Sequence, residues 1–495
     1  EETIACLKKW ESKDDPRIKI RYGKKNLHIS GASNEALRMA TGEFIALLDH
    51  DDELAPDALL ENVKVINRQP DVDMIYSDED KISEKGERST PFFKPSWSLD
   101  LILSHMYSGH LGMYRKSIVD RIGGFRVGYE GSQDYDLVLR FREKTTGEKI
   151  AHIPRILYHW RTLATSTAII PESKNYAYGA ARQAISDYLD RRGEKALVEI
   201  GDDWGCYRVI REIVGRPKVS IVIYSQDERA LAHCLKSIYR TATYENMEMI
   251  VVSAGGKNRV AGFEGLEKPP LIFLESGDIR HSVPGAYNLG AKRSGGEVLL
   301  FLNENIEAMK PGWLEALIEH IQRKEIGIVG GEILKGDATI VSAGLILHKE
   351  KVRVNAFEYY QDKNVPYFGQ HHVIRNCSAM PAACLMTKKG IFLEVGGFSE
   401  EQLPTKYYDV DLCLKITGKG YRILYTPFAK LMIHQEKTEG TSAGGMGTGR
   451  RNRDPEEGYM QKRWGDYLGN DPYYNPNLSA DGRFHINTGA VRYDR

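Results

Sequence analysis

Acidic side chains gather at the end of an apolar run near the start of the chain. Residues 44–52 read FIALLDHDD, five apolar residues followed by Asp49, His50, Asp51 and Asp52. Open α/β sheets bind ligands at the carboxyl ends of their strands, so this pattern predicts carboxylates at a ligand-binding edge. Clustered carboxylates repel one another, and their hard oxygen atoms suit Mg²⁺ or Mn²⁺, which commonly also contact substrate phosphates.

Two other interpretations of this segment stay open. Asp52 and Glu53 directly precede an expected helix, and acids there can simply form a solvated loop that caps the helix. An aspartyl-phosphate phosphatase also carries two aspartates after its first strand. That class would have a threonine at the position of Glu53.

A carboxylate and a histidine further along the chain fit the same chemistry. Asp134 in QDYDLVLR (133–140) precedes an apolar helical stretch, where it serves either as a helix cap or as a general base for a hydroxyl group. His159 follows the apolar run IPRILY. Alone, such a histidine is usually structural, but together with the acids it becomes a candidate metal ligand.

The elements that must position these residues follow an α/β pattern. Short apolar runs alternate with amphipathic helical stretches, which is typical of a mainly parallel sheet covered by helices. A helix capped by Ser30 or Ser33 precedes the buried strand expected at 44–48. A helix after Pro56 and a strand at 72–76 follow.

The second half of the chain repeats the first. Three pairs of segments match in the same order, GEFIALLDHDD (42–52) with GEVLLFLNENI (296–306), IGGF (122–125) with VGGF (395–398), and QDYDLVLR with YDVDLCLK (408–415). Asp134 and Asp409 lie 275 residues apart, as do His159 and His434. Ordered matches of this kind indicate a duplication.

The repeat predicts two domains and their boundaries. We expect a first domain at 1–165, a helical connector at 166–216, a second domain at 217–470 and a C-terminal tail at 471–495. Compared with the second domain, the first would lack its N-terminal strands and the helix between them. We therefore expect residues 1–495 alone to be inactive.

Composition narrows the class of protein. Of the 495 residues, 68 are basic and 68 acidic, so bulk electrostatics give no reason to expect nucleic-acid binding. The six cysteines form no C-x-x-C pair, which argues against a disulfide framework or a zinc ribbon and is typical of a reducing cytoplasm. No apolar run approaches the roughly 18 residues of a membrane helix. We therefore expect a cytoplasmic protein.

Several motifs together resemble inverting glycosyltransferases of family 2. They are LLDHDDELAP, IYSDEDKI, FKPSWSLD, GGFRVGYEGSQDYDLVLR and LYHWRTLATSTA. The resemblance covers nearly the whole chain and implies two tandem domains with the Rossmann-like, nucleotide-sugar-binding fold called type A. It is strongest to bacterial enzymes that make O-antigen and related surface polysaccharides.

The resemblance implies a role for each residue of the first site. Asp134 would be the catalytic base that deprotonates the acceptor hydroxyl, and Asp51 and His159 would hold Mg²⁺ or Mn²⁺ on the diphosphate. The donor-binding residues would be Asp49, which contacts the ribose, Asp52, which supports Asp51 in holding the metal, and Arg161, which neutralises the leaving diphosphate.

The second domain departs from this pattern. Asn303, Glu304 and Asn305 stand where the family usually carries two aspartates after an asparagine. Asn303 and Glu304 would still bind the donor, Asp409 would be the base and His434 a metal ligand, but an amide at Asn305 lacks the charge that grips a divalent cation. Either this domain transfers sugar with relaxed metal dependence, or it is a degenerate module that binds glycan or scaffolds the first. We favour the module.

These observations together predict an enzyme. It would move a hexosyl or deoxyhexosyl group from a nucleotide sugar to a growing bacterial surface glycan by a metal-assisted, inverting displacement. The family implies a lipid-linked oligosaccharide or glycan acceptor, and peripheral association with the inner face of the plasma membrane. The contrasting hypothesis is a carbohydrate-binding or scaffold protein with degenerate transferase domains and no turnover.

Overall fold

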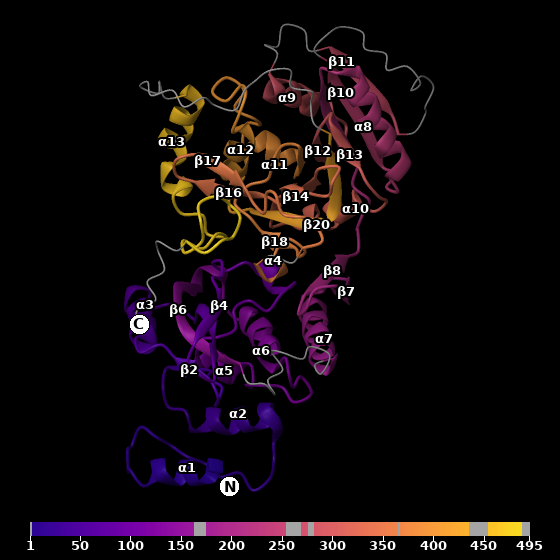
Figure 1. Ribbon diagram of the computed structural model, residues 1–495. Coiled ribbons are helices and arrows are strands. Elements are labelled where there is room, and N and C mark those ends of the chain that lie inside the picture. The colour runs from indigo at the N-terminus through magenta and orange to yellow at the C-terminus, as the bar shows by residue number, and fades with distance from the viewer. Residues whose placement is uncertain are drawn as a thin grey trace. The chain divides into compact units, whose positions relative to one another are not determined.

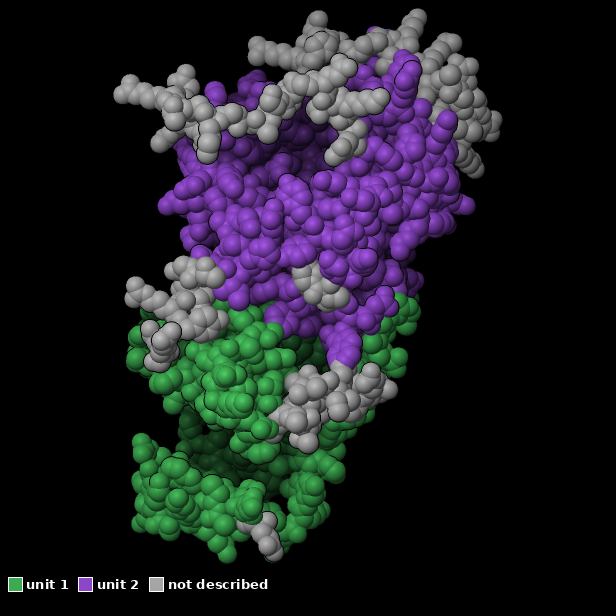
Figure 2. All heavy atoms as spheres, in the orientation of Figure 1, with its two compact units in different colours: residues 1–97, 106–200 green, residues 98–105, 201–495 purple. Residues whose placement is uncertain are grey.

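The computed structural model describes residues 2–162, 175–253, 269–275, 282–364, 367–434 and 454–487. Figure 1 labels their helices and strands. They fall into two compact units, which Figure 2 shows in different colours. Unit 1 comprises residues 1–97 and 106–200, and unit 2 comprises residues 98–105 and 201–495. Each unit has its own sheet and its own helices.

Unit 1 is built on one mixed sheet. Its strand order is β1-β5-β3-β6-β2, with β4 paired to β3. Strands β3 and β6 are parallel, whereas β1 with β5, β3 with β5, and β2 with β6 are antiparallel. The elements are α1 (Glu2–Glu11), α2 (His28–Met39), β1 (Phe44–Ala46), β2 (Glu53–Leu54), α3 (Ala58–Arg68), β3 (Met74–Ser83), β4 (Arg88–Phe92), β5 (Gly112–Arg115), α5 (Lys116–Arg121), α6 (Gln133–Arg142), β6 (Ile150–Thr162), α7 (Asn175–Arg191) and β7 (Ala196–Ile200).

Unit 2 has a larger sheet, in the order β11-β10-β9-β12-β19-β14-β20-β13, with β15 beside β14 and β18 beside β20. Strands β16 and β17 form a separate hairpin. The elements are α4 (Leu99–Ile102), β8 (Tyr207–Arg211), β9 (Val219–Ser225), α8 (Glu228–Thr241), β10 (Met247–Ser253), β11 (Leu271–Glu275), α9 (Val283–Arg293), β12 (Val298–Asn303), β13 (Ile306–Ala308), α10 (Glu315–Ile321), β14 (Ile326–Leu334), β15 (Ile340–Ser342), β16 (Leu345–His348), β17 (Val352–Asn355), β18 (Arg375–Asn376), β19 (Cys384–Lys388), α11 (Lys389–Glu394), α12 (Tyr408–Thr417), β20 (Arg422–Ile433) and α13 (Pro455–Leu468).

Five neighbouring strands match between the two sheets. The order β1-β5-β3-β6-β2 corresponds to β12-β19-β14-β20-β13, and each corresponding pair runs in the same relative direction. In unit 2, strands β9, β10 and β11 continue the sheet beyond β12. Among the described residues of unit 1, β1 is the last strand on that side. It is only half-buried, and Leu48 is 52% exposed, so the predicted burial of strand 44–48 is wrong.

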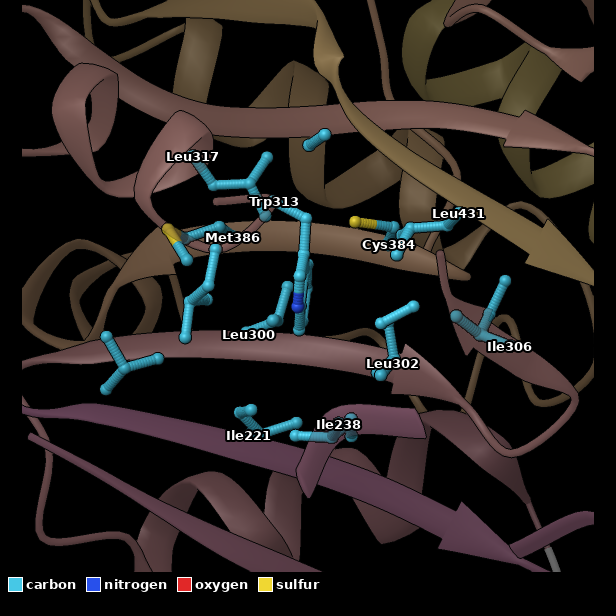
Figure 3. Packing of buried hydrophobic residues seen from close by; sticks show 14 of the residues in the cluster. Ile221, Ile238, Leu300, Leu302, Ile306, Trp313, Leu317, Cys384, Met386 and Leu431 are labelled. Carbon is cyan, nitrogen blue, oxygen red and sulfur yellow. The ribbon is translucent and has the colours of Figure 1, made fainter. Parts of the chain in front are cut away.

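The core of unit 2 lies between the sheet and the helices α8 and α10. Strands β9 and β12 are buried on both faces, which explains their continuous apolar runs. The Trp313 side chain is fully buried among core residues that include Leu300, Leu317 and Met386 (Figure 3). Because this core is closely packed, the loop that follows β12 starts from a rigid strand.

The same asparagine clamp recurs in both units. Asn34 in α2 donates to the Phe125 carbonyl at 2.8 Å and accepts from the Phe125 amide at 2.9 Å. Asn288 in α9 makes the same two bonds to Phe398, at 2.9 and 3.0 Å. The clamp ties a sheet-covering helix to the G-G-F turn that leads toward α6 or α12, which supports the duplication found in the sequence.

The clamp leaves no room for a side chain at the second glycine of the turn. A Cβ at Gly124 would lie 2.4 Å from Asn34 Oδ1, whereas a Cβ at Gly123 would meet nothing within 4 Å. Both glycines have positive φ, 68° and 82°. We expect Gly123→Ala to cost unit 1 about 1–2 kcal/mol from backbone strain alone. Gly124→Ala should cost about 1–3 kcal/mol more, because it also displaces the clamp.

Hydrogen exchange of peptides from α2 measures both costs. Equal losses of protection in the two variants would contradict the role given to the clamp.

The structure differs from the predicted caps of α2 and divides the predicted connector between the two units. Helix α2 begins at His28, and its N-cap, Leu27, makes no side-chain cap, so the predicted caps Ser30 and Ser33 are wrong. The stretch predicted as a helical connector divides at residue 200, with α7 in unit 1 and β8 in unit 2. The predicted domain boundaries stay a prediction.

Candidate active site

The acidic loop after β1 is held by strand β6. The Asp52 carboxylate accepts the Tyr158 hydroxyl at 2.5 Å and the Arg161 amide at 2.7 Å. The Arg161 guanidinium donates to the Asp51 carbonyl at 2.7 Å and pairs with Glu53. Asp52 and Arg161, both predicted to bind the donor, therefore also shape the loop itself. The Asp49 side chain is left 56% exposed at the rim.

A histidine that sequence reasoning missed lies beside Asp49. The His110 Nε2 is 4.0 Å from Asp49 Oδ2, and its Nδ1 is 3.4 Å from Glu79 Oε2. The ring stacks on Tyr158, with 4.7 Å between centroids. The buried Lys94 ammonium donates to Glu79 at 2.8 Å and to the His110 carbonyl at 2.6 Å. Basic and acidic side chains therefore alternate in the order Lys94, Glu79, His110 and Asp49.

The pKa values of this chain of groups reflect their contacts. Burial alone would raise the pKa of Glu79, but Lys94 and His110 lower it to about 2. Burial alone would lower the pKa of His110, but Glu79, with a contribution from Asp134, raises it above its ordinary value. Glu79 is therefore ionised at neutral pH, and its charge stabilises the protonated form of His110.

Asp134 stands in the first turn of α6 and belongs to the same group of charges. Its Oδ1 accepts the Tyr135 amide at 2.8 Å. Burial raises the pKa of Asp134, while the charge of His110 opposes that rise and Asp49 adds to it. A carboxylate with a raised pKa is a better proton acceptor, which suits the predicted general base. Asp49 and His110 are thus neighbours, and the charges of both act on Asp134.

His159 is oriented by a buried carboxylate. Its Nδ1 lies 2.5 Å from Asp80 Oδ1, and the other Asp80 oxygen accepts Arg88 at 2.6 Å. This is the carboxylate–histidine arrangement that leaves Nε2 as the nitrogen able to ligate a metal. Within the described ranges, neither group of three potential ligands within 4.8 Å of one another includes Asp51 or His159. Their metal-binding role stays a prediction.

The raised pKa of His110 predicts that the stability of the fold depends on pH. A histidine whose folded pKa is raised stabilises the fold at pH values below its unfolded pKa of about 6.5, and this contribution is lost as pH rises through the folded pKa. We expect His110→Ala to lower the unfolding temperature more at about pH 6 than at about pH 9. Thermal unfolding of both proteins at the two pH values tests this. An equal loss at both would show that only the ring stacking matters.

The corresponding loop of unit 2 is organised differently. The Glu304 carboxylate turns inward and accepts the Ser225 hydroxyl at 2.8 Å and the amides of Gln226 and Asp227 at 3.1 Å. Burial raises the pKa of Glu304. Asn303 Oδ1 accepts the Asn305 amide at 2.8 Å. Glu304 thus fixes the turn between β9 and α8, and the donor-binding roles of Asn303 and Glu304 stay predictions.

Asp409 occupies in unit 2 the place that Asp134 has in unit 1. It lies in the first turn of α12 and accepts the Val410 amide at 2.9 Å and the Ala382 amide at 3.4 Å. The next residue, Ala383, accepts the Asn303 amide at 3.2 Å. Asp409 and Asn303 thus both contact the segment of Ala382 and Ala383. By strand register, Ala383 takes in unit 2 the position that His110 has in unit 1.

His159 and His434 are not structural equivalents, although their spacing from the aspartates predicted it. Strand β2 places Glu53 opposite His159, whereas β13 places the matching Glu307 opposite Met432. His434 therefore takes the position of Arg161, two residues further on. Its Nε2 lies 2.9 Å from Glu307 Oε2 and the side chain is 45% exposed, whereas His159 is buried.

The model of the family described as glycosyl transferase family 2 matches residues 1–123 and 219–385. The chain belongs to this family, with two tandem type A domains.

Two relatives that match most of the chain come from bacteria. The chain is 36% identical over 474 residues to protein y4gI of Sinorhizobium fredii, covering 94% of this chain and 52% of that protein. It is 31% identical over 485 residues to the O-antigen biosynthesis protein RfbC of Myxococcus xanthus, covering 96% of this chain and 37% of that one. The chain thus spans about half or less of each relative.

A solved structure of GalNAc-T7 with UDP, GalNAc and Mn²⁺ matches with a TM-score of 0.38 at 14% identity, over 46% of this chain and 45% of that one. This likeness is too low to carry an argument. No helix within the described ranges combines the length and apolar character needed to cross a bilayer.

Proposed function

We propose that this glycosyltransferase moves a sugar from a nucleotide-sugar donor to a growing bacterial surface glycan with inversion at the anomeric carbon. The observation that carries the proposal is the contact between Asp49 and His110 at the rim of the unit 1 sheet, together with the electrostatic influence of both groups on Asp134. An acceptor hydroxyl attacks the anomeric carbon, its proton passes to Asp134, and the bond from that carbon to the phosphate oxygen breaks. The nucleoside diphosphate leaves.

Four site residues of unit 1 have proposed roles in this displacement. Asp134 takes the proton, and its raised pKa favours that transfer. Asp49, exposed at the rim, accepts hydrogen bonds from the donor's ribose. Arg161, and His110 when it is protonated, are proposed to offset negative charge on the departing diphosphate, the kind of preorganised stabilisation that is usually the largest catalytic contribution.

Asp51 and His159 are the residues proposed to hold Mg²⁺ or Mn²⁺. They fit such an ion, because Asp80 orients His159 for coordination and Asp51 offers a hard carboxylate oxygen. When bound, the ion would neutralise charge on the diphosphate.

The description of one relative supports a class of product. RfbC is described as an O-antigen biosynthesis protein, which supports a surface polysaccharide as the product here. Such glycans grow on lipid carriers, so we propose a lipid-linked oligosaccharide acceptor and peripheral association with the cytoplasmic face of the membrane. Unit 2, whose loop carries Asn303 and Asn305 in place of aspartates, is proposed to bind glycan or to scaffold unit 1. A protein that only binds carbohydrate is the alternative.

Donor binding tests the proposal. Calorimetric titration of the protein at its full natural length with a panel of nucleotide sugars and Mn²⁺ should reveal one preferred nucleotide, with binding weakened at least tenfold by Asp51→Ala. His50→Ala is the matched control, because it changes a neighbouring exposed side chain that has no proposed ligand role. Equal binding of the nucleotide sugar with and without Mn²⁺ would contradict the proposed role of the metal ion. No binding of any nucleotide sugar would favour the carbohydrate-binding alternative.

A further inference from the structure

Two imidazoles in unit 2 converge on one carboxylate oxygen. His233 Nε2 lies 3.0 Å from Glu307 Oε2, and His434 Nε2 lies 2.9 Å from the same atom. The two rings meet edge to face, with 4.6 Å between centroids. One ligand atom from each of the three residues lies within 4.8 Å of the other two.

The fold brings these residues together from three elements. Glu307 lies in β13 between the buried residues Ile306 and Ala308, so its side chain points away from the core. The His434 amide donates to the Asn305 carbonyl at 3.0 Å, which places His434 diagonally across from Glu307 on the neighbouring strand. His233 comes from the exposed face of α8, whose other face is buried in the core.

A cation fixes the carboxylate from the other side. Arg240, two turns beyond His233 on α8, donates to Glu307 Oε1 at 2.8 Å. Oε1 is therefore engaged, and Oε2 is presented to the two imidazoles.

We propose that His233, Glu307 and His434 form a binding site for a zinc-type transition-metal ion. Two imidazoles and one carboxylate are ligands typical of Zn²⁺ sites that keep a fourth position open for water or another ligand. Ligand atoms in a tetrahedral zinc site lie about 3.3 Å apart, given bonds of about 2.0 Å. The observed separations of 2.9 and 3.0 Å thus need only a small widening.

This site differs in chemistry from the one predicted for nucleotide-sugar binding. The site predicted in unit 1 combines one carboxylate, Asp51, with one imidazole, His159, for Mg²⁺ or Mn²⁺. The site in unit 2 has two imidazoles on one carboxylate, and this larger share of nitrogen favours zinc or its neighbours in the transition series. His434 cannot serve both sites at once. Zinc at His233, Glu307 and His434 would therefore give unit 2 a bound metal that does not depend on the missing aspartates.

Calorimetric titration of the chain with zinc chloride tests the site, with magnesium chloride titrated in parallel. We expect micromolar zinc binding that His233→Ala and Glu307→Gln each weaken at least tenfold, and no comparable magnesium binding. His485→Ala is the matched control, since that histidine is also exposed in unit 2. Circular dichroism checks that each variant is folded.

The chain offers an internal competitor for zinc. Asp362, His371 and His372 form the second such group of three among the described residues, and His371 is fully buried. His372→Ala should leave the zinc affinity unchanged. Loss of zinc binding in His372→Ala, unchanged binding in His233→Ala, or no zinc binding at about 100 μM would each overturn the proposal.

Discussion

Replacing Asp134 by asparagine is expected to reduce sugar transfer by about 10²–10⁴-fold, because an amide cannot accept the proton of the acceptor hydroxyl. Its size and its bond from the Tyr135 amide are kept, so donor affinity and stability should change little. The rate of nucleoside diphosphate release with acceptor present, measured on the protein at its full natural length, gives the effect. A loss in kcat with an unchanged KM for the donor is the expected signature.

The matched control for this variant is Asp409→Asn in unit 2. That aspartate also stands in the first turn of a helix and accepts the amide of the next residue. If unit 2 is a binding or scaffolding module, Asp409→Asn should leave transfer within about twofold of the parent protein. Unchanged transfer in Asp134→Asn, or an equal loss in both variants, would contradict the assignment of the base to unit 1.

Replacing Asp136 by alanine is expected to destabilise unit 1 by about 3–5 kcal/mol. Its side chain is 1% exposed and pairs with two arginines. Arg126 Nε donates to Oδ1 at 3.0 Å and Arg140 Nε donates to Oδ2 at 2.8 Å. Arg140 also donates to the Gly124 carbonyl at 2.6 Å, so the carboxylate indirectly supports the clamp turn. Removing the carboxylate leaves two guanidinium groups without their shared partner.

Hydrogen exchange of peptides from α6 measures this loss as a change in the free energy of local opening. The control is Asp120→Ala, which breaks the pair with Lys116 at 2.7 Å, where the Asp120 side chain is 51% exposed. An exposed pair of this kind contributes about 0–1 kcal/mol. Similar losses in the two variants would show that burial does not set the cost.

Much of the fold could be predicted from local pattern. The strands expected at 44–48 and 72–76 correspond to β1 and to the start of β3, and the ordered repeats agree with five strands that match between the sheets. The place of Asp134 in the first turn of α6 was predictable because it depends only on the local start of a helix. The partial exposure of β1 was not predictable from its apolar residues, because burial depends on which strands lie beside it.

The neighbours of Asp49 could not be predicted. His110 reaches the site because β5, which follows it, pairs with β1 and β3, a set of long-range antiparallel contacts that no local pattern encodes. The only signal was the motif YSDED, in which Glu79 contacts His110 and Asp80 orients His159. The inequivalence of His159 and His434 arises from strand register, which equal spacing in sequence does not determine.

The most direct test of the central claim is turnover itself, followed by nuclear magnetic resonance of the sugar product. The full-length protein, a panel of nucleotide sugars and a lipid-linked oligosaccharide are incubated together with Mn²⁺. The account predicts release of nucleoside diphosphate from one donor and a new glycosidic bond whose anomeric configuration is opposite to that of the donor. A product that retains the donor's configuration, or no transfer from any donor, would contradict it.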